Sequence, residues 1–270
     1  MRIKHFSSTH LLRAASHGYC KRTMVERLAA SDADLCVVGG DFCGDLSRSI
    51  RELAPIAETM PVVYVPGNLD YYSSEPMERT FLDAQEAAAR IGNIHLLNNS
   101  SVTLGGVRFL GATLWTEIPE KLSRGPLISR INDFTYIRTL DGPWSPGRQN
   151  IEHRKTVDFL EDELSRETAG PTVVVTHNVP HESVNDPKYA GGELSPFFVT
   201  DVAWLTEGPS APDYWIVGNN MITAVARLGR TKVLSNALGH VTRDGFENNA
   251  FDWDCVFEAG PAPGYTAAYG

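Results

Sequence analysis

Five short runs rich in apolar residues, each followed at once by small or polar residues, constrain the fold of this chain more than any other feature. The runs span residues 2–6, 35–38, 62–65, 172–175 and 214–217. Nearly continuous apolar runs of this length are typical of strands buried on both faces of a covered sheet. Apolar residues at helical spacing lie between these runs, at 21–30, 47–54, 75–91 (with Ser74 as N-cap) and 151–165. The alternation predicts an α/β fold.

The pattern changes from about residue 94, where hairpins begin. Gly105-Gly106 separates the runs 102–104 and 107–110, and Gly229-Arg230 separates 225–228 and 232–234. Glycine between alternating apolar runs indicates a hairpin. Strand–helix alternation followed by hairpins predicts two sheets packed face to face with helices outside. We expect one domain over 1–259, with 142–147 as a loop inside it, and a flexible Pro/Gly-rich tail over 260–270.

Charge and cysteine content limit the partners and the compartment that we expect. The chain has 24 Lys and Arg against 33 Asp and Glu, so 24 − 33 gives a net charge of −9. A nucleic-acid-binding protein needs a basic face, so the balance argues against that role. No apolar run approaches the roughly 20 residues that span a bilayer. The four cysteines show no metal-binding spacing, which favours reduced thiols and a cytoplasmic protein without membrane partners.

Polar residues follow the predicted strands in an informative order. They are Ser8-x-His10, Gly40-Asp41, Gly67-Asn68-Leu69-Asp70, His177 and Gly218-Asn219-Asn220-Met221. Side chains at the carboxyl ends of strands gather at one edge of an α/β sheet. The order resembles that of calcineurin-like metallophosphoesterases, whose pattern runs D-x-H, G-D, G-N-H-[DE], H, G-H-x-H. The resemblance covers about residues 1–259 and implies a four-layer α/β/β/α sandwich of two mixed sheets flanked by helices.

The resemblance also implies a chemistry. Members of this family hold two divalent cations, which clamp phosphoryl oxygens and activate a water molecule. Carried over by position, Asp41 would bridge the two ions. Asn68 and His177 would bind one ion, and His10 would lie beside the other.

This chain departs from the family pattern at the ligand positions. Ser8 replaces an aspartate, Leu69 replaces the catalytic histidine, and Asn219 and Met221 replace the last two histidines. Asn178 stands where many relatives have a further histidine. The first ion site keeps His10 and Asp41, and we expect it to be empty. The other keeps Asp41, Asn68 and His177, so we expect no cofactor, or at most one weakly held divalent metal ion.

A buried carboxylate without a metal ion needs another cation, so we expect Asp41 to pair with His10 or His177. The leading hypothesis is a repurposed, metal-independent enzyme that performs an elimination, cyclisation or isomerisation with His10, Asp41 and His177 as acid–base residues. A weak single-metal phosphoesterase and a non-catalytic ligand-binding pseudoenzyme are the alternatives. A hydrogen-bonded Asp41–His177 pair that only holds two loops together is the purely structural interpretation.

The partner that we expect is a small molecule, and pairing of exposed sheet edges would allow a homo-oligomer. Apolar Leu69 and Met221 favour an organic ligand. The residues expected to line its pocket are Ser8, Cys43, Asn68, Leu69, Asp70, Asp133, Asn178, His181, Asn219, Met221 and His240.

Overall fold

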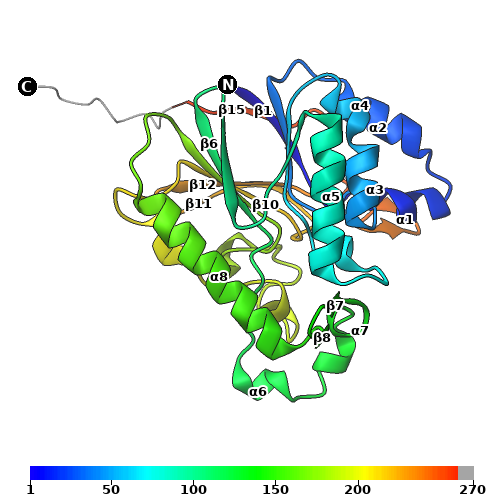
Figure 1. Cartoon of the computed structure of the whole chain (residues 1–270), viewed down its shortest axis with the longest axis vertical. Coiled ribbons are helices and arrows are strands. Elements are labelled where there is room, and N and C mark those ends of the chain that lie inside the picture. Colours follow the sequence, from blue (N-terminus) through cyan, green and yellow to red (C-terminus); the bar gives the residue numbers. More distant parts are fainter. Residues whose placement is uncertain (261–270) are drawn as a thin grey trace, which may run out of the picture.

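The computed structural model describes residues 1–260, which form two sheets packed face to face (Figure 1). The first sheet has the strand order β15-β1-β2-β3-β4. Its strands are β1 (Arg2–Phe6), β2 (Leu35–Val38), β3 (Val62–Tyr64), β4 (Ile94–Leu96) and β15 (Val256–Glu258). Strands β1 to β4 are parallel, whereas β15 runs antiparallel to β1 at the edge. The residues that follow the carboxyl ends of these parallel strands therefore lie at the same edge of the sheet.

The second sheet has the order β11-β12-β10-β9-β6-β5. Its strands are β5 (Ser100–Leu104), β6 (Val107–Ala112), β9 (Thr172–Thr176), β10 (Tyr214–Val217), β11 (Thr223–Leu228) and β12 (Thr231–Asn236). The four inner strands are parallel, and the two expected hairpins supply the antiparallel edges β5 and β11.

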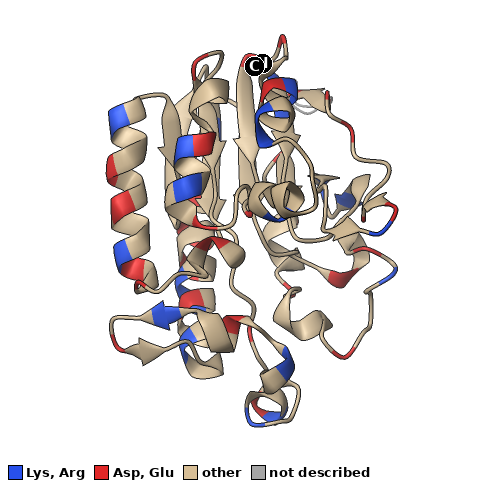
Figure 2. Ribbon diagram, turned by 90° about the vertical axis from the view of Figure 1, so that its right-hand side faces the viewer, with Lys and Arg blue, Asp and Glu red and all other residues tan. Residues whose placement is uncertain are grey.

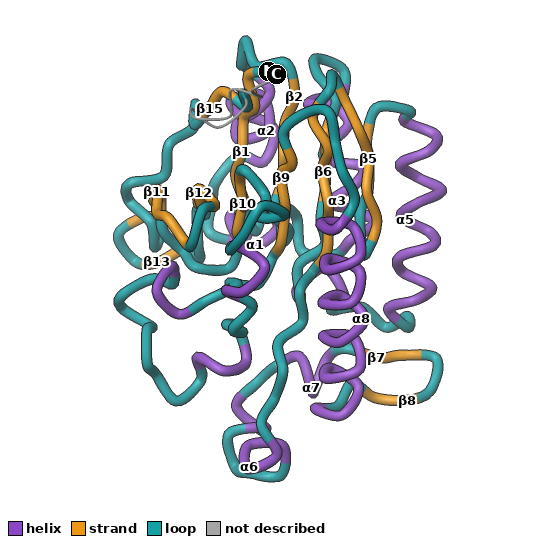
Figure 3. Tube along the Cα trace, turned by 90° about the vertical axis from the view of Figure 1, so that its left-hand side faces the viewer, coloured by secondary structure: helices purple, strands orange, loops and turns teal. Residues whose placement is uncertain are grey.

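Helices cover the outer face of each sheet (Figures 1 and 3). Those over the first sheet are α1 (Leu11–Ser16), α2 (Lys21–Ala29), α3 (Leu46–Glu52), α4 (Ala54–Ala57) and α5 (Met77–Ile91). Helix α8 (Pro146–Ser165) contacts β6 of the second sheet. The expected four-layer α/β/β/α sandwich is confirmed.

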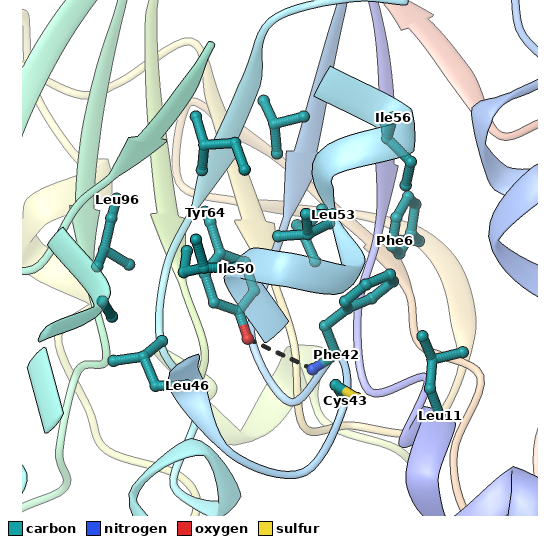
Figure 4. Packing of buried hydrophobic residues seen from close by; sticks show 14 of the residues in the cluster. Phe6, Leu11, Phe42, Cys43, Leu46, Ile50, Leu53, Ile56, Tyr64 and Leu96 are labelled. Atoms are coloured by element: carbon teal, nitrogen blue, oxygen red, sulfur yellow. Dashed lines mark hydrogen bonds between the residues drawn. The ribbon is translucent and has the colours of Figure 1, made fainter. Parts of the chain in front are cut away.

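The layers explain why the strands are apolar at every position. In β2, Cys36 and Val38 pack with the helices, while Leu35 and Val37 pack between the two sheets. A strand with a hydrophobic layer on each side shows no polar alternation. Figure 4 shows part of the helix-side cluster, in which the ring of Phe6 lies near that of Phe42, with centroids 6.0 Å apart.

Three helix boundaries differ from those expected. Helix α5 begins at Met77 rather than near Ser74, because Pro76 is extended (ψ 143°) at the N-cap. The segment 47–54 divides at Leu53 into α3 and α4. Helix α8 begins at Pro146, five residues before the expected 151, because the Ser145 hydroxyl accepts a hydrogen bond from the Arg148 N–H (3.2 Å) and Pro146 occupies the first turn.

A segment of short elements between β6 and α8 extends beyond one end of the sandwich (Figures 1 and 3). It contains α6 (Glu120–Ser123), η2 (Ile128–Arg130), α7 (Asp133–Tyr136), β7 (Arg138–Thr139) and β8 (Gly142–Pro143). After β9 and β12 come three 3-10 turns and a small hairpin, η3 (Glu182–Val184), η4 (Ser195–Phe197), η5 (Ala203–Thr206), β13 (Val241–Thr242) and β14 (Gly245–Phe246).

Both signs of charge are interspersed along the helices on the face drawn in Figure 2. Over residues 1–260, no helix combines the length and the apolar character needed to cross a membrane. The flexible tail expected over 260–270 lies outside the described residues from 261 onward.

Candidate functional site

The site lies where the carboxyl ends of the parallel strands of the two sheets come together. Asp41 follows β2 of the first sheet and His177 follows β9 of the second, and both side chains are fully buried. Nε2 of His177 lies 3.4 Å from Oδ2 of Asp41. Oδ1 of Asp41 accepts a hydrogen bond from the backbone N–H of Leu69 at 3.0 Å. Of the two partners expected for Asp41, the structure brings His177 into contact.

Two glycines allow this close approach. A Cβ at Gly67 would lie 2.1 Å from Oδ1 of Asp41, and one at Gly40 would lie 2.5 Å from Nδ1 of His177. Gly40 also has a φ of +87°, a conformation that other residues rarely adopt. The glycines of the sequence motifs therefore make room for the pair itself.

Both ring nitrogens of His177 face hydrogen-bond acceptors. Nδ1 lies 2.7 Å from the carbonyl oxygen of Gly39, and Nε2 lies 3.1 Å from Oδ1 of Asn68. The amide of Asn68 is oriented by Asp133, because its Nδ2 donates to Oδ1 of Asp133 at 2.8 Å. An imidazole that faces an acceptor on each side donates from both nitrogens only when it is protonated. The two acceptors therefore favour the imidazolium form of His177.

The electrostatics agree with this protonation state. Burial disfavours the charged ring, but the Asp41 carboxylate and the Gly39 carbonyl together raise the pKa of His177 above its usual value. Burial likewise acts against the charged carboxylate, yet the adjacent His177 holds the pKa of Asp41 below its usual value. The two residues form a buried ion pair.

Asp70 lies beneath this pair and holds the loops that carry it. Its carboxylate accepts hydrogen bonds from Tyr64 Oη (2.6 Å), Ser49 Oγ (2.8 Å) and the backbone N–H groups of Gly67 (2.8 Å) and Asp41 (3.0 Å). Burial and the nearby charge of Asp41 raise the pKa of Asp70 to about 6. Asp70 was expected to line a pocket, and the structure places it as a positioning residue instead.

A second group of polar side chains gathers beside Asp41. Ser7 pairs with Ala237, which joins the carboxyl ends of β1 and β12 and brings the following segments together. The rings of His10 and His240 stack there, with centroids 4.6 Å apart and planes at 17°. Burial lowers the pKa of His10 to about 4 and also lowers the pKa of His240. Both rings are therefore neutral at pH 7.

Five buried polar atoms of this group have no hydrogen-bond partner within residues 1–260. They are Ser8 Oγ, His10 Nδ1 and Nε2, Asp41 Oδ2 and His240 Nδ1. An unsatisfied buried polar atom costs about 1–3 kcal/mol, so such atoms are rare and their clustering indicates a place for a polar ligand. We call these atoms the polar cluster.

Residues after β10 flank the site, and some of their side chains form hydrogen bonds there. Nδ2 of Asn219 donates to Oδ1 of Asn178 at 2.8 Å, and Nδ2 of Asn178 donates to the carbonyl oxygen of Leu114 at 3.1 Å. Met221 is buried, and Leu69, Asn219 and His240 are half-buried. Leu69 and Met221 add apolar surface to a polar centre.

Two expected site residues lie elsewhere. The Cys43 side chain packs in the helix-side cluster (Figure 4), and burial raises the pKa of its thiol to about 12. His181 caps the turn η3, where its Nδ1 accepts a hydrogen bond from the Ser183 N–H at 3.1 Å. Within residues 1–260, neither side chain forms a hydrogen bond or an ion pair with Asp41 or His177.

One residue that the sequence analysis missed contacts the site. The hydroxyl of Tyr72 donates to Oδ1 of Asp133 at 2.5 Å, so Asp133 is held between Tyr72 and Asn68. Tyr72 ends the Asp70-Tyr71-Tyr72 stretch, and its nearness to the Asn68 motif was the available signal. A tyrosine in such a position is equally typical of a packing residue.

Comparison with known proteins identifies the family. Residues 1–218 match the model of a protein family described as "Calcineurin-like phosphoesterase". The chain belongs to this family. It is 24% identical over 218 residues to the uncharacterized protein L509 of Acanthamoeba polyphaga mimivirus. The aligned region covers 75% of this chain and 76% of the viral protein.

Two solved structures share the fold of this family member. The phosphopantetheinyl hydrolase PptH of Mycobacterium tuberculosis superposes with a TM-score of 0.65 at 14% identity, covering 88% of this chain and 89% of that one. Protein TT1561 of Thermus thermophilus gives a TM-score of 0.50 at 16% identity, covering 87% and 88%. At these identities the likeness shows the fold alone.

The donor set does not fit the pair of metal ions that the family implies. Throughout residues 1–260, no group of three or more His, Cys, Asp or Glu side chains is arranged to hold a metal ion. Asp41, Asn68 and His177 turn one atom each toward a common point, but His177 Nε2, as an imidazolium N–H, donates to Oδ1 of Asn68 and lies in an ion pair with Asp41. A metal ligand must present a lone pair instead. We therefore derive no chemical step through a metal ion.

Proposed function

We propose that this protein is a metal-independent acid–base enzyme on the calcineurin-like phosphoesterase fold. Its substrate is a small organic molecule with a hydroxyl or enol group, and its reaction is an elimination, cyclisation or isomerisation. The observation that carries the proposal is the buried His177–Asp41 ion pair beside the polar cluster.

The chemistry of the polar cluster supports the substrate class. Oδ2 of Asp41 only accepts hydrogen bonds, whereas Ser8 and the neutral rings of His10 and His240 each donate and accept. A hydroxyl group also does both, so it would satisfy Asp41 on one side and His10 or Ser8 on the other. A phosphate or carboxylate group, which has only acceptor oxygens when ionised, would be repelled by Asp41.

The two protonation states support acid–base work. His177, as an imidazolium, has a proton to give, and Asp41 stabilises the charge before the transfer. His10 is neutral at pH 7 and neither of its buried ring nitrogens has a partner within residues 1–260, so in the proposed reaction it is the group placed to accept a proton from the substrate. One proton leaves the substrate to His10 and one enters it from His177, so the reaction needs no oxidant and no net change in charge; release of the proton from His10 and its return to His177 complete the cycle.

Two half-buried residues lie against the fully buried centre. The N–H of Leu69 contacts Asp41, and His240 stacks on His10, so both connect the fully buried groups to partly exposed surface. Apolar side chains beside a few convergent polar groups are typical of small-molecule sites.

A single-metal phosphoesterase is the second candidate, favoured by one observation. The 3.1 Å and 3.4 Å separations of His177 Nε2 from Asn68 Oδ1 and Asp41 Oδ2 bring three atoms together that would become ligands if His177 lost its Nε2 proton. Proton and metal ion would compete for this place. Added divalent metal at high pH would favour the ion.

The test is a ligand screen followed by assays with and without metal. The chelator-treated protein is screened against small hydroxylated and enolisable compounds by thermal shift, and stabilising compounds are incubated and analysed for products. We expect conversion in the presence of chelator, abolished in His177→Gln and Asp41→Asn. Exposed Glu86→Gln, from a surface ion pair, serves as the matched control and keeps full activity.

Two outcomes would contradict the proposal. Metal-stimulated turnover of an aryl phosphate, lost in the same two variants, would establish the single-metal candidate. Ligands that stabilise the protein but are never converted would establish the binding-only alternative.

A further inference from the structure

A hollow outside the polar cluster combines features of a ligand site. It has a volume of about 380 Å³ and is lined by Tyr72, Ser73, Ser74, Thr135, Tyr136 and Arg138. The lining comes from the segment after β3 and from α7 and β7. Two chain segments distant in sequence therefore build it together.

Two aromatic rings form part of the lining. The rings of Tyr72 and Tyr136 have centroids 5.3 Å apart and planes at 39°. Tyr136 is 53% exposed, so packing in the core does not explain this side chain. Tyrosine gives a rigid aromatic surface with a polar end, which suits contact with a flat ligand.

Arg138 provides an uncompensated positive charge at the same hollow. Across the described part of the chain, Arg138 forms no ion pair, although the whole sequence carries a net charge of −9. Two acidic side chains near the β7–β8 hairpin, Glu78 and Asp141, are both engaged by Arg148, at 3.2 and 3.0 Å. The guanidinium of Arg138 is thus available for another anion, in a hollow that Ser74 and Thr135 also line.

We propose that this hollow binds a small aromatic ring that carries an anionic group. The guanidinium of Arg138 pairs with the anion, and the tyrosine rings contact the ring face. A carboxylate and a phosphate monoester share the geometry that an arginine fork recognises. The site is separate from the polar cluster, and its occupancy does not depend on catalysis at His177.

The hollow is nevertheless connected to the buried ion pair. The Tyr72 hydroxyl binds Asp133, which orients Asn68 and, through it, the proton on His177 Nε2. A ligand that displaces the Tyr72 hydroxyl from Asp133 would change the hydrogen bonding at His177. Binding at the hollow would therefore be detectable as a change in the hydrogen bonding of the His177–Asp41 ion pair.

The experiment is calorimetric titration of the full chain with three probes of similar size: 4-hydroxybenzoate, phenyl phosphate and the neutral benzyl alcohol. We expect saturable binding of at least one anionic probe and none of benzyl alcohol. Arg138→Gln removes one charge-assisted contact, so it should weaken binding roughly ten- to hundredfold. The comparison of the two anions distinguishes a carboxylate ligand from a phosphate ligand.

Arg227→Gln is the matched control, because Arg227 is an exposed arginine on β11 of the other sheet. It should leave the affinity unchanged, and Tyr136→Ala should reduce it. Equal binding by Arg138→Gln and the parent protein, or no binding of either anion, would overturn the proposal. His177→Gln should still bind the anion, so a failure of the proposed enzymatic function remains distinguishable from a failure here.

Discussion

Replacing Asp41 with asparagine tests the buried ion pair most sharply. The change keeps the size of the side chain but leaves the His177 imidazolium without a counter-charge in a place that no solvent reaches. Removing one partner of a buried ion pair destabilises a protein by about 3–5 kcal/mol. For a chain of this size, that loss corresponds to a fall in Tm on the order of 10 °C.

The loss should depend on pH in a defined direction. The pKa of His177 is raised in the folded protein, so its contribution is complete below about pH 6.5, the usual histidine value, and disappears as pH rises through the folded pKa. The pKa of Asp41 is lowered, so its contribution is present above about pH 4 and is lost as pH falls through the folded pKa. The difference between the parent protein and Asp41→Asn should therefore be larger at about pH 5.5 than at about pH 9.

Urea denaturation of the parent, Asp41→Asn, His177→Gln and the double variant gives the coupling energy of the pair. Glu86→Gln, which breaks the exposed Arg90–Glu86 pair (3.7 Å), should change stability by less than about 1 kcal/mol. A coupling energy below about 0.5 kcal/mol, or one that is equal at both pH values, would refute the reasoning.

Three further outcomes are expected. Asp70→Asn should lower the free energy of unfolding by about 2 kcal/mol in urea denaturation, because a neutral amide oxygen accepts the hydrogen bonds of the Gly67 and Asp41 N–H groups less strongly than a carboxylate does; an unchanged midpoint would contradict the role given to Asp70. Gly67→Ala should lower it by about 1–3 kcal/mol, since its Cβ would lie 2.1 Å from Asp41 Oδ1, and a neutral effect would mean that the loop yields freely. A thiol reagent at neutral pH should label exposed Cys20 well before buried Cys43, as followed by peptide mass spectrometry, and equal rates would show that Cys43 is accessible.

The fold could be predicted because its strongest signal is local. Strands such as β2 are apolar at every position, since Val37 faces one hydrophobic layer and Val38 the other. The start of α8 was missed because Ser145-Pro146 lies in a Gly- and Pro-rich stretch that is typical of loops, although the same two residues form a helix cap. One pattern supported two local structures, and tertiary packing selected one.

The site was predictable where residues end parallel strands. Asp41 and His177 meet because the two sheets align their carboxyl ends, which follows from topology. The directions of side chains within a loop do not follow from topology. Asp70 therefore turned out to hold backbone N–H groups, and Cys43 packs against the helices. Tyr72 was missed because its partner Asp133 is 61 residues away in sequence.

The protonation of His177 is the most direct test of the whole account. Nitrogen-15 NMR of the histidine rings, assigned with His177→Gln, reports whether each ring nitrogen carries a proton. At neutral pH with chelator present, both nitrogens of His177 should be protonated, and an excess of Mg²⁺ should leave them so. Loss of the Nε2 proton on addition of the ion, with stoichiometric metal uptake, would show that a cation and not a proton belongs between Asp41 and Asn68.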